Sequence, residues 1–450
     1  MPNFRSLLTG CSRPSILIIC VQRPRWQSRN SNRSSTIPVS PRGLRYLVEH
    51  PCARRWPGDN GRHVNIGPLT SWRFFAAALV VFYHYTGSAF AAWPEWIQRF
   101  MSNGYQAVGF FFVLSGFVLV YTYHMDGSPS EMKTTPKQFW LARFARIYPV
   151  YALALLLALA PFLWTVYSRK SISAVNFGLT LGATPAVLQA WIPSTCLVWN
   201  GPAWSLSVEA FFYLFFPWLM FSMRRWTSSW MAVAASLLLA VGAAGLLHWI
   251  FPLFETGAPT PSESVAHHFF AYFPLFHLPT FLLGMALGMV YLSASRQDVN
   301  PLFYNALAIV SFGLVCALFC LHGRVRPILL SSTITVPIYG LLIYSSARCS
   351  GLLWTFLSHR WLVRLGDASY ALYIIHAPVG WWFSVCLKRF SVQHALVYFM
   401  FYFVSVVAAC LLIHKYFEMP LKDKILGKFG RPIAAVMSAS QTVRAPHALF

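Results

Sequence analysis

Long apolar runs dominate the chain from residue 66 onward, and short polar stretches separate them. Because an α-helix rises about 1.5 Å per residue, a run of about 20 apolar residues is long enough to cross the hydrocarbon core of a membrane. The sequence therefore predicts an all-α integral membrane protein with about ten transmembrane helices in one bundle. The ten runs lie near 72–92, 104–123, 148–168, 203–223, 229–251, 270–292, 301–321, 328–346, 367–387 and 394–414.

The polar stretches between the runs predict the orientation in the membrane. An even number of crossings places both termini on one side, and the loops on that side carry most of the Lys and Arg residues. The loop at 252–268, on the other side, carries none. Cytoplasmic loops are enriched in basic residues, so both termini are expected to be cytoplasmic in a multi-pass protein of the plasma (inner) membrane. The apolar stretch 177–192 is expected to form an interfacial or re-entrant helix.

The two ends of the chain differ from the apolar part. Residues 1–65 are rich in Arg, Pro, Ser and Asn, and their one apolar stretch, 16–21, is too short to span or to form a secretory signal. We expect 1–65 to be a basic, disordered N-terminal extension or sequence upstream of the true start. Residues 66–420 form the expected transmembrane domain, and 421–450 the expected cytoplasmic tail.

Composition supports the membrane interpretation. The chain is 57% hydrophobic and 10% charged, whereas charges make up about a quarter of a soluble chain. Its net charge of +23 would suit nucleic acid or an anionic membrane surface, but the basic residues lie between apolar runs. We therefore expect membrane lipids as partners and no nucleic acid. The nine cysteines form no C-x-x-C pair, so neither a disulfide framework nor a metal site is expected.

Ionisable residues within the apolar runs are the candidates for chemistry, since charges in a membrane are costly. Arg73 and His84 are eleven residues apart, which places them on one face of the first helix. Glu209, the only carboxylate well inside a run, comes out at a depth similar to that of His84. A carboxylate beside an imidazole would make it a better general base for a hydroxyl, although a purely structural buried pair fits the same depths.

Two arginines mark the cytoplasmic approach to the third run. Arg143 and Arg146 are three residues apart and so project from one helix face. Paired guanidiniums are typical of phosphate-binding sites, because each can donate two hydrogen bonds to a phosphate group. Anchoring to lipid headgroups is the alternative.

The ninth run carries a polar stripe of Tyr370, Tyr373 and His376. This stripe could line a cavity, or it could form hydrogen bonds between helices. Asp367 and Glu418 lie at the cytoplasmic ends of runs, where a capping or surface role is expected.

Taken in order, these segments resemble the acyltransferase-3 family of membrane O-acyltransferases, which modify surface polysaccharides and related acceptors. The resemblance covers about residues 66–420. It rests on Arg73 with His84, on Phe110-Phe111-Phe112-Val113-Leu114-Ser115-Gly116-Phe117, on Arg143-x-x-Arg146 with Tyr148-Pro149, on Trp204-Ser205-Leu206-Ser207-Val208-Glu209, on Phe281-Leu282-Leu283-Gly284, on residues 366–376, and on Tyr416-Phe417-Glu418-Met419-Pro420.

The resemblance implies an acyltransferase that transfers groups other than amino-acyl groups. The acyl group, usually acetyl, would come from acyl-CoA at the cytoplasmic face and pass to a hydroxyl of a carbohydrate or lipid-linked acceptor. Acyl-CoA would be a co-substrate, and no cofactor would be bound permanently. His84 would act as the base with Arg73 as its companion, Glu209 would support His84 or the acceptor, and Arg143 and Arg146 would bind the CoA phosphates.

Two further groups of residues follow from this interpretation. Ser115, Gly116 and Phe117 are expected to form part of the acyl-CoA pathway, where glycine allows a close approach. The residues expected to contact the acceptor or to line the cavity are Trp204, Ser205, Tyr373 and His376. Trp191, Trp199 and Trp204 could stack on sugar rings, although tryptophan also anchors ordinary helices at the membrane interface.

The chain departs from the family pattern in two respects. It has Gly109 where the family often has Asp, so any role of that carboxylate is missing. It also shows no appended esterase-type domain after residue 420, so we expect it to act alone or to pass an intermediate to another protein. Ser115 could be an acyl-carrying nucleophile, but no triad pattern surrounds it, and direct transfer is preferred.

Two other functions remain open at this stage. One is a transporter or flippase of a lipid-linked saccharide, which would also need polar groups inside a helical bundle. No internal repeat of the kind typical of such transporters is visible. The other is an inactive relative that only binds its acceptor.

Overall fold

The computed structural model describes residues 66–90, 92–125, 128–169, 172–223, 229–254, 265–294, 300–321, 334–387 and 395–429. The chain divides into two units, Met1–His63 and Val64–Phe450. The expected N-terminal extension and residues 430–450 of the expected tail lie outside the described residues. The fold below is that of the second unit alone.

Helices make up almost all of the described chain, as the apolar runs predict. The one small sheet in the described part is the antiparallel pair β1 (His124–Met125) and β2 (Ser128–Met132). The longer helices are α1 (Gly67–Ala89), α3 (Ala107–Tyr123), α4 (Pro136–Arg169), α6 (Trp204–Met223), α7 (Ser229–Phe254), α9 (Pro274–Ser293), α10 (Pro301–Cys320), α11 (Thr335–Arg348), α14 (Ser369–Leu387) and α15 (Ala395–Ile413). The shorter ones are α2 (Glu95–Ser102), α5 (Ala174–Ala183), α8 (Val265–Tyr272), α12 (Gly351–Leu357), α13 (Arg360–Asp367), η1 (Gly104–Gln106), η2 (Gln189–Trp191), η3 (Gly201–Ala203) and the π-helical turn η7 (His414–Glu418).

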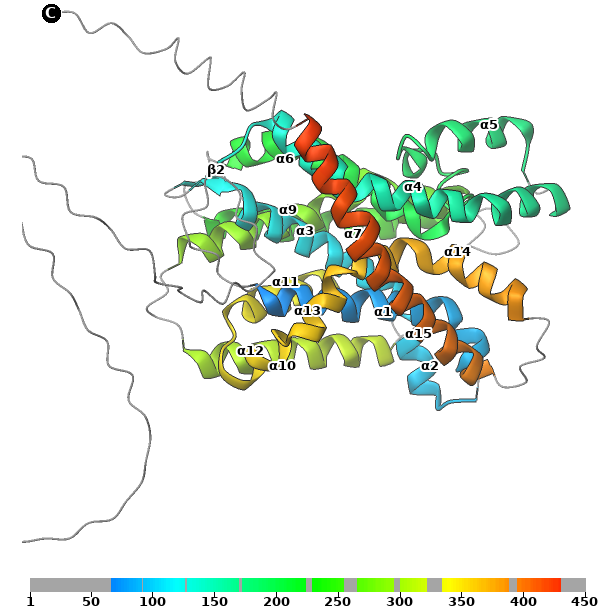
Figure 1. Cartoon of the computed structure of the whole chain (residues 1–450). Coiled ribbons are helices and arrows are strands. Elements are labelled where there is room, and N and C mark those ends of the chain that lie inside the picture. Colours follow the sequence, from blue (N-terminus) through cyan, green and yellow to red (C-terminus); the bar gives the residue numbers. More distant parts are fainter. Residues whose placement is uncertain are drawn as a thin grey trace, which may run out of the picture. The chain divides into compact units, whose positions relative to one another are not determined.

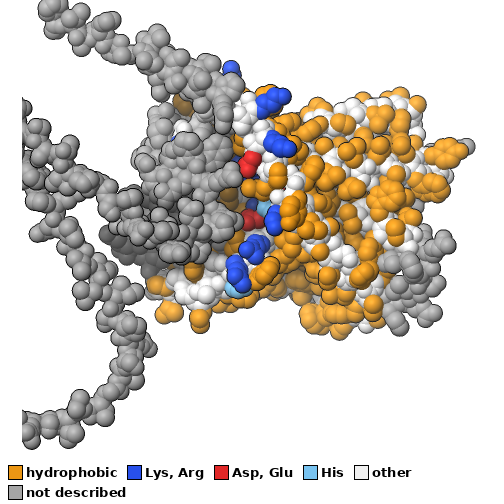
Figure 2. All heavy atoms as spheres, viewed as in Figure 1, with side chains coloured by type: hydrophobic (Ala, Val, Ile, Leu, Met, Phe, Trp, Pro, Cys, Tyr) orange, Lys and Arg blue, Asp and Glu red, His pale blue; other side chains and the backbone are white. Residues whose placement is uncertain are grey.

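Each of the ten expected runs overlaps one of the longer helices, although residues 328–333 of the eighth run lie outside the described part. Six helical segments in the described part are long and apolar enough to cross a membrane: Glu95–Tyr123, Pro136–Ser168, Gly201–Met223, Val265–Ser293, Pro301–Cys320 and Leu396–Phe429. Figure 2 shows that apolar side chains cover most of the described face, while charged side chains gather along one edge of it. This distribution suits a multi-pass membrane protein; the count of ten crossings and the orientation stay predictions.

The stretch 177–192 is not a single helix. α5 ends at Ala183, and a turn then leads to η2. The hydroxyl of Tyr151 on α4 donates to the carbonyl of Thr184 at 2.5 Å and so holds this turn. Gln189 is buried, so this part of the segment enters the protein core.

Glycines bring α3 and α9 into backbone contact, and α9 lies along α3 (Figure 1). A Cβ atom at Gly284 would lie 2.0 Å from the carbonyl oxygen of Val113, and one at Gly116 would lie 2.2 Å from that of Phe281. Small residues allow such close packing of membrane helices. The expectation that Gly116 permits a close approach is confirmed, and the partner is the backbone of α9.

α1 lies among α3, α13, α14 and α15. Its start is tied to α13, where a Cβ at Gly366 would lie 1.9 Å from the carbonyl oxygen of Thr70. Figure 1 shows α15 passing obliquely across this group of helices. Two apolar clusters make up the core, one around α3, α6 and α9 and one around α1, α14 and α15. Arg73 and His84 on α1 therefore face neighbours from several helices.

The α3 and α9 contact generates a stability prediction. Gly284→Ala should lower the free energy of unfolding by about 1–3 kcal/mol, because the added methyl group meets rigid backbone. The thermal unfolding midpoint of the purified variant in detergent measures the loss.

Gly313→Ala on α10 is the matched control, since nothing lies within 4 Å of the position of its Cβ. Alanine favours a helix over glycine by up to about 1 kcal/mol, so this variant should be neutral or slightly more stable. Equal unfolding midpoints for the two variants would contradict the packing argument.

Candidate active site

Two histidines from different helices meet in the described core. The Nε2 atom of His376 on α14 lies 3.4 Å from the Nδ1 atom of His84 on α1, and the ring centroids are 4.9 Å apart. His376 is 0% exposed, whereas the side chain of His84 is exposed. Of the two, His84 is therefore the ring that a substrate can reach.

Backbone carbonyls fix both rings. His84 Nδ1 lies 2.8 Å from the carbonyl oxygen of Val80, and His376 Nδ1 lies 2.8 Å from that of Tyr373. The hydroxyl of Tyr402 on α15 donates to the carbonyl of His376 at 2.7 Å. The pair thus joins α1, α14 and α15 within one set of hydrogen bonds.

In the described part, Glu209 is hydrogen-bonded to Tyr213 and Ser115 and not to His84, the expected partner. The hydroxyl of Tyr213 donates a short hydrogen bond to its carboxylate, and the hydroxyl of Ser115 on α3 donates to the same oxygen at 3.3 Å. Within the described residues no hydrogen bond or ion pair joins Glu209 to His84. The expected pairing of the two is therefore replaced by a Glu209 cluster and a separate histidine pair.

The loop before α6 explains this difference. The amide of Asn200 donates to the carbonyl of Ile374 at 3.0 Å, and the hydroxyl of Tyr373 donates to the carbonyl of Pro202 at 3.0 Å. The start of α6 is therefore level with the second turn of α14, inside the bundle. Counting depth from the end of the apolar run places Glu209 too close to that end.

A hydrogen bond joins the two helices that carry Glu209 and His376. The hydroxyls of Ser205 and Tyr373 lie 2.7 Å apart. Tyr373 is one turn before His376 on α14, and Ser205 is one turn before Glu209 on α6. We use the name polar ladder for the connected residues His84, His376, Tyr373, Ser205, Glu209, Ser115, Tyr213 and Arg143.

Arg143 forms the far end of this ladder. It donates to the hydroxyl of Tyr123 at 2.8 Å, and its guanidinium carbon lies 5.3 Å from the ring centroid of Tyr123 and 5.9 Å from that of Tyr213. Its buried Nε has no hydrogen-bond partner among the described residues. Arg143 thus retains an unused donor beside Glu209.

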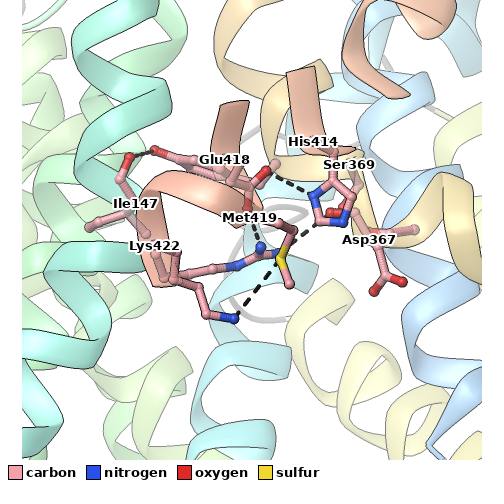
Figure 3. A network of polar contacts seen from close by, with 10 residues as sticks. Ile147, Asp367, Ser369, His414, Glu418, Met419 and Lys422 are labelled. Atoms are coloured by element: carbon pink, nitrogen blue, oxygen red, sulfur yellow. Dashed lines mark hydrogen bonds and ion pairs between the residues drawn. The ribbon is translucent and has the colours of Figure 1, made fainter. Parts of the chain in front are cut away.

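Arg146 is held in an ion pair. It donates to the carboxylate of Glu418, which is 0% exposed, and to the backbone carbonyl of Asp367 at 3.4 Å. The second oxygen of Glu418 lies 3.0 Å from Nδ1 of His414, and Figure 3 shows Glu418 pointing to this partner. The expected surface or capping role of Glu418 is wrong, because the π-helical turn η7 directs its side chain toward α4.

Arg73 lies near Arg146 and far from His84. The separation of eleven residues along α1 corresponds to about 16 Å. Its charge interacts with those of Arg146, Asp367 and Glu209, and no hydrogen bond of its side chain is found in the described part. We call Arg73, Arg143, Arg146, Glu209, Asp367 and Glu418 the arginine cluster.

Two of the remaining expected residues, Phe117 and Trp204, pack against aromatic rings. Phe117 is fully buried with its ring centroid 5.5 Å from that of Tyr291, which is a packing role. Trp204 lies 4.8 Å from Tyr272 and 5.4 Å from His277 between ring centroids. Trp204 is thus part of an aromatic group beside Ser205.

The other two tryptophans of the expected acceptor surface are engaged elsewhere. Trp191 packs edge-on against Phe211 and Phe273. Trp199 stacks on Phe162 at 5.0 Å and donates to the carbonyl of Leu155 at 3.2 Å. Their contacts are those of structural residues.

Sequence reasoning missed Tyr213, Tyr123 and His414. Tyr213 follows Glu209 by four residues, and His414 precedes Glu418 by four. Residues at this spacing are neighbours on a helix, so the sequence alone indicates both pairs. Tyr123 contacts Arg143 from the end of the preceding helix, α3, and no helical spacing indicates this contact.

The ion pair of Arg146 and Glu418 generates a second stability prediction. Glu418→Gln leaves a largely buried guanidinium, 20% exposed, without its anion, which should cost about 3 kcal/mol of unfolding free energy. The thermal unfolding midpoint in detergent should fall accordingly, and Arg146→Met combined with Glu418→Leu should recover much of the loss.

Glu95→Gln provides the control, since Glu95 forms an exposed ion pair with Arg99 on α2. Such surface pairs contribute at most about 1 kcal/mol. A Glu418→Gln midpoint as close to wild type as that of Glu95→Gln would show that the buried pair is dispensable.

Comparison with known proteins agrees with this arrangement. A family model described as an acyltransferase domain, that of the acyltransferase-3 family, matches residues 69–415. The chain is 28% identical to acyltransferase MdmB of Streptomyces mycarofaciens over 329 residues, 71% of this chain and 80% of MdmB. It is 24% identical to O-acetyltransferase OatA of Staphylococcus aureus over 386 residues, 79% of this chain but 57% of OatA.

A shorter match is 45% identical to "Protein 2 in picA locus" of Rhizobium radiobacter over 69 residues, 15% of this chain and 35% of that protein. No solved structure matches the chain. The family match covers more than half of the chain and includes both the arginine cluster up to Asp367 and the histidine pair. The chain therefore belongs to the acyltransferase-3 family and is an enzyme that transfers acyl groups.

Proposed function

We propose that this protein moves an acyl group, preferably acetyl, from acyl-CoA at the cytoplasmic face to a hydroxyl of a carbohydrate or lipid-linked acceptor. The observation that carries the proposal is the polar ladder, which leads from the arginine cluster to an exposed histidine through otherwise apolar helices. We place the protein in the plasma (inner) membrane with both termini cytoplasmic.

The arginine cluster suits the CoA end of the substrate. Arg73 forms no described hydrogen bond, and Arg143 retains a buried N–H donor without a partner. A phosphate group would satisfy Arg73, since guanidinium and phosphate form paired charge-assisted hydrogen bonds, and Arg143 would contribute its positive charge. Glu418 holds Arg146 in place, so Arg146 would contribute its charge and its remaining donors.

The histidine pair suits the chemical step. His84 Nε2 would take the proton of the acceptor hydroxyl while the oxygen attacks the carbonyl carbon of the thioester. The new C–O ester bond forms, the C–S bond breaks, and the CoA sulfur leaves and recovers the proton from His84. No other reactant is needed, and no cofactor has to be bound permanently.

Direct transfer is supported over a covalent intermediate on Ser115. Its hydroxyl donates to Glu209 at 3.3 Å and belongs to the part of the ladder next to the arginines. Glu209 is within hydrogen-bond reach of Ser115, but the same oxygen already accepts from Tyr213, and a serine nucleophile also needs donors for its oxyanion. Glu209 is therefore proposed to orient Ser115 and Tyr213 along the acyl pathway.

The acceptor is proposed to approach His84 from its exposed side. Trp204, Ser205 and Tyr373 lie at the same level of α6 and α14. Ser205 and Tyr373 are nearly buried, so the partly exposed ring of Trp204 is proposed to contact the sugar first. The name of OatA, an O-acetyltransferase, supports an oxygen acceptor, and that of MdmB supports acyl transfer. Family membership favours this enzyme over a transporter or flippase.

Labelled acetyl-CoA tests the function directly. Inverted membrane vesicles that contain the wild-type protein expose the cytoplasmic face and carry the acceptors of the host. They should transfer label from acetyl-CoA to the lipid or polysaccharide fraction, and His84→Ala should reduce the transfer by about 10²–10⁴-fold because the general base is lost.

His359→Ala is the control, since His359 is an exposed histidine before α13 and should leave transfer unchanged. Label that stays in CoA with the wild type as it does with His84→Ala would rule out the enzymatic function in these membranes.

Arg73 provides a test of the donor site. Arg73→Gln should raise the apparent KM for acetyl-CoA by about 10-fold, because one charge-assisted phosphate contact contributes about 1.5–3 kcal/mol. Arg364→Gln is the control, since Arg364 is exposed and lies over the ring of Trp361. Equal KM values for acetyl-CoA in the two variants would show that Arg73 does not bind CoA.

A further inference from the structure

The two histidines of the pair have different surroundings and therefore different roles. His84 is exposed, while His376 is 0% exposed and enclosed by α1, α14 and α15. A residue without accessible surface does not touch an acceptor that arrives from outside. His376 acts on the reaction only through the ring that it contacts.

The hydrogen bonds define which nitrogen of His376 carries the proton. Its Nδ1 lies 2.8 Å from the carbonyl oxygen of Tyr373 and 3.2 Å from that of Leu372. A lone pair on Nδ1 would face two carbonyl oxygens, so the proton resides there. The Nε2 atom of a neutral His376 then carries the lone pair, and this atom faces His84.

The same argument applies to His84. Its Nδ1 lies 2.8 Å from the carbonyl oxygen of Val80 and 3.4 Å from Nε2 of His376. Both neighbours are acceptors, so Nδ1 carries the proton and shares it between them. The lone pair of His84 is thereby left on Nε2, the atom that the proposed reaction needs.

Other titratable groups do not fill this role in the described part. Tyr83 on α1 lies 5.0 Å from His84 between ring centroids, and Tyr105 of η1 contacts Tyr83. Tyr85 and Tyr402 contact each other with tilted rings, 4.7 Å apart between centroids, and the hydroxyl of Tyr373 is hydrogen-bonded to that of Ser205. Among the described residues no carboxylate hydrogen-bonds to His84, so the acceptor that carboxylates supply in many enzymes is here an imidazole.

We propose that His376 is the positioning residue of His84: its Nε2 lone pair accepts the Nδ1–H of His84 and so keeps Nε2 of His84 available as the base. The proposal rests on the proposed function. His376 was expected to line the cavity or contact the acceptor; in this proposal it instead orients His84.

The interaction strengthens during the reaction. When His84 takes the hydroxyl proton, its Nδ1–H becomes the donor of a cation, and charge-assisted hydrogen bonds are about twice as strong as neutral ones. The Nε2 lone pair of His376 thus stabilises the imidazolium more than the neutral ring. An interaction of this kind raises kcat and leaves the binding of acyl-CoA unchanged.

Substitution of His376 tests the proposal with the vesicle assay and labelled acetyl-CoA as the probe. His376→Phe removes the acceptor and should lower the rate at saturating acetyl-CoA by about 10–100-fold, with the apparent KM for acetyl-CoA within about twofold of wild type. His376→Gln retains an acceptor oxygen and should recover part of the rate.

Trp382→Phe on the same helix is the matched control. It removes the hydrogen bond of the indole nitrogen to the carbonyl of Leu157 but leaves both imidazoles, so its rate should stay within about twofold of wild type. Wild-type rates in a folded His376→Phe protein would overturn the proposal, provided that His84→Ala is inactive. Wild-type rates in His84→Ala would instead overturn the proposed function, and the inference would fall with it.

A measurement on the wild-type protein avoids any loss of folding in the variants. In protein labelled with ¹⁵N-histidine, nuclear magnetic resonance distinguishes a protonated from a bare ring nitrogen. The signals of His84 and His376 are assigned by their loss in His84→Gln and His376→Gln. We expect both rings with the proton on Nδ1 and none on Nε2; a proton on Nε2 of His84 would overturn the proposal.

Discussion

A charge among apolar helices is stable only when a partner or a ligand compensates it, and this constraint organises the described bundle. Arg146 and Glu418 meet it together, and their ion pair joins α4 to the segment after α15. Arg143 meets it through Tyr123 and Tyr213. Because each charge requires a defined neighbour, these contacts determine which helices lie side by side at one end of the bundle.

Glycine contacts provide the rigid part of the same bundle. Gly116 and Gly284 let α3 and α9 touch through their backbones, and Gly366 does the same for α13 and α1. Backbone contact leaves no room for a side chain to adjust, so the levels of these helices are fixed relative to each other. Ser115 precedes Gly116 at one such contact, so the α3 side of the polar ladder is rigid.

The sequence predicted the helices and the polar residues well, because a run of about 20 apolar residues and an ionisable residue within it are both local signals. It did not predict the partners. The depth of Glu209 depends on Asn200 and Gln189, which fold into the core before α6 begins. Glu418 points inward because of a π-helical turn. Neither feature has a periodic pattern, so Glu209 was assigned to His84 and Glu418 to the surface.

The order of groups along the polar ladder fits the chemistry of the proposed donor. Charges gather at one end, around Arg73, Arg143 and Arg146, where the phosphates of CoA would bind. The connection to His376 is made of the hydroxyls of Ser205 and Tyr373, which are polar but uncharged. A neutral thioester arm would pass along hydroxyls at little electrostatic cost, whereas the guanidiniums would retain the phosphates. In the proposed function the ladder would therefore separate the anionic part of the substrate from the reacting carbonyl, and His84 would meet only the latter.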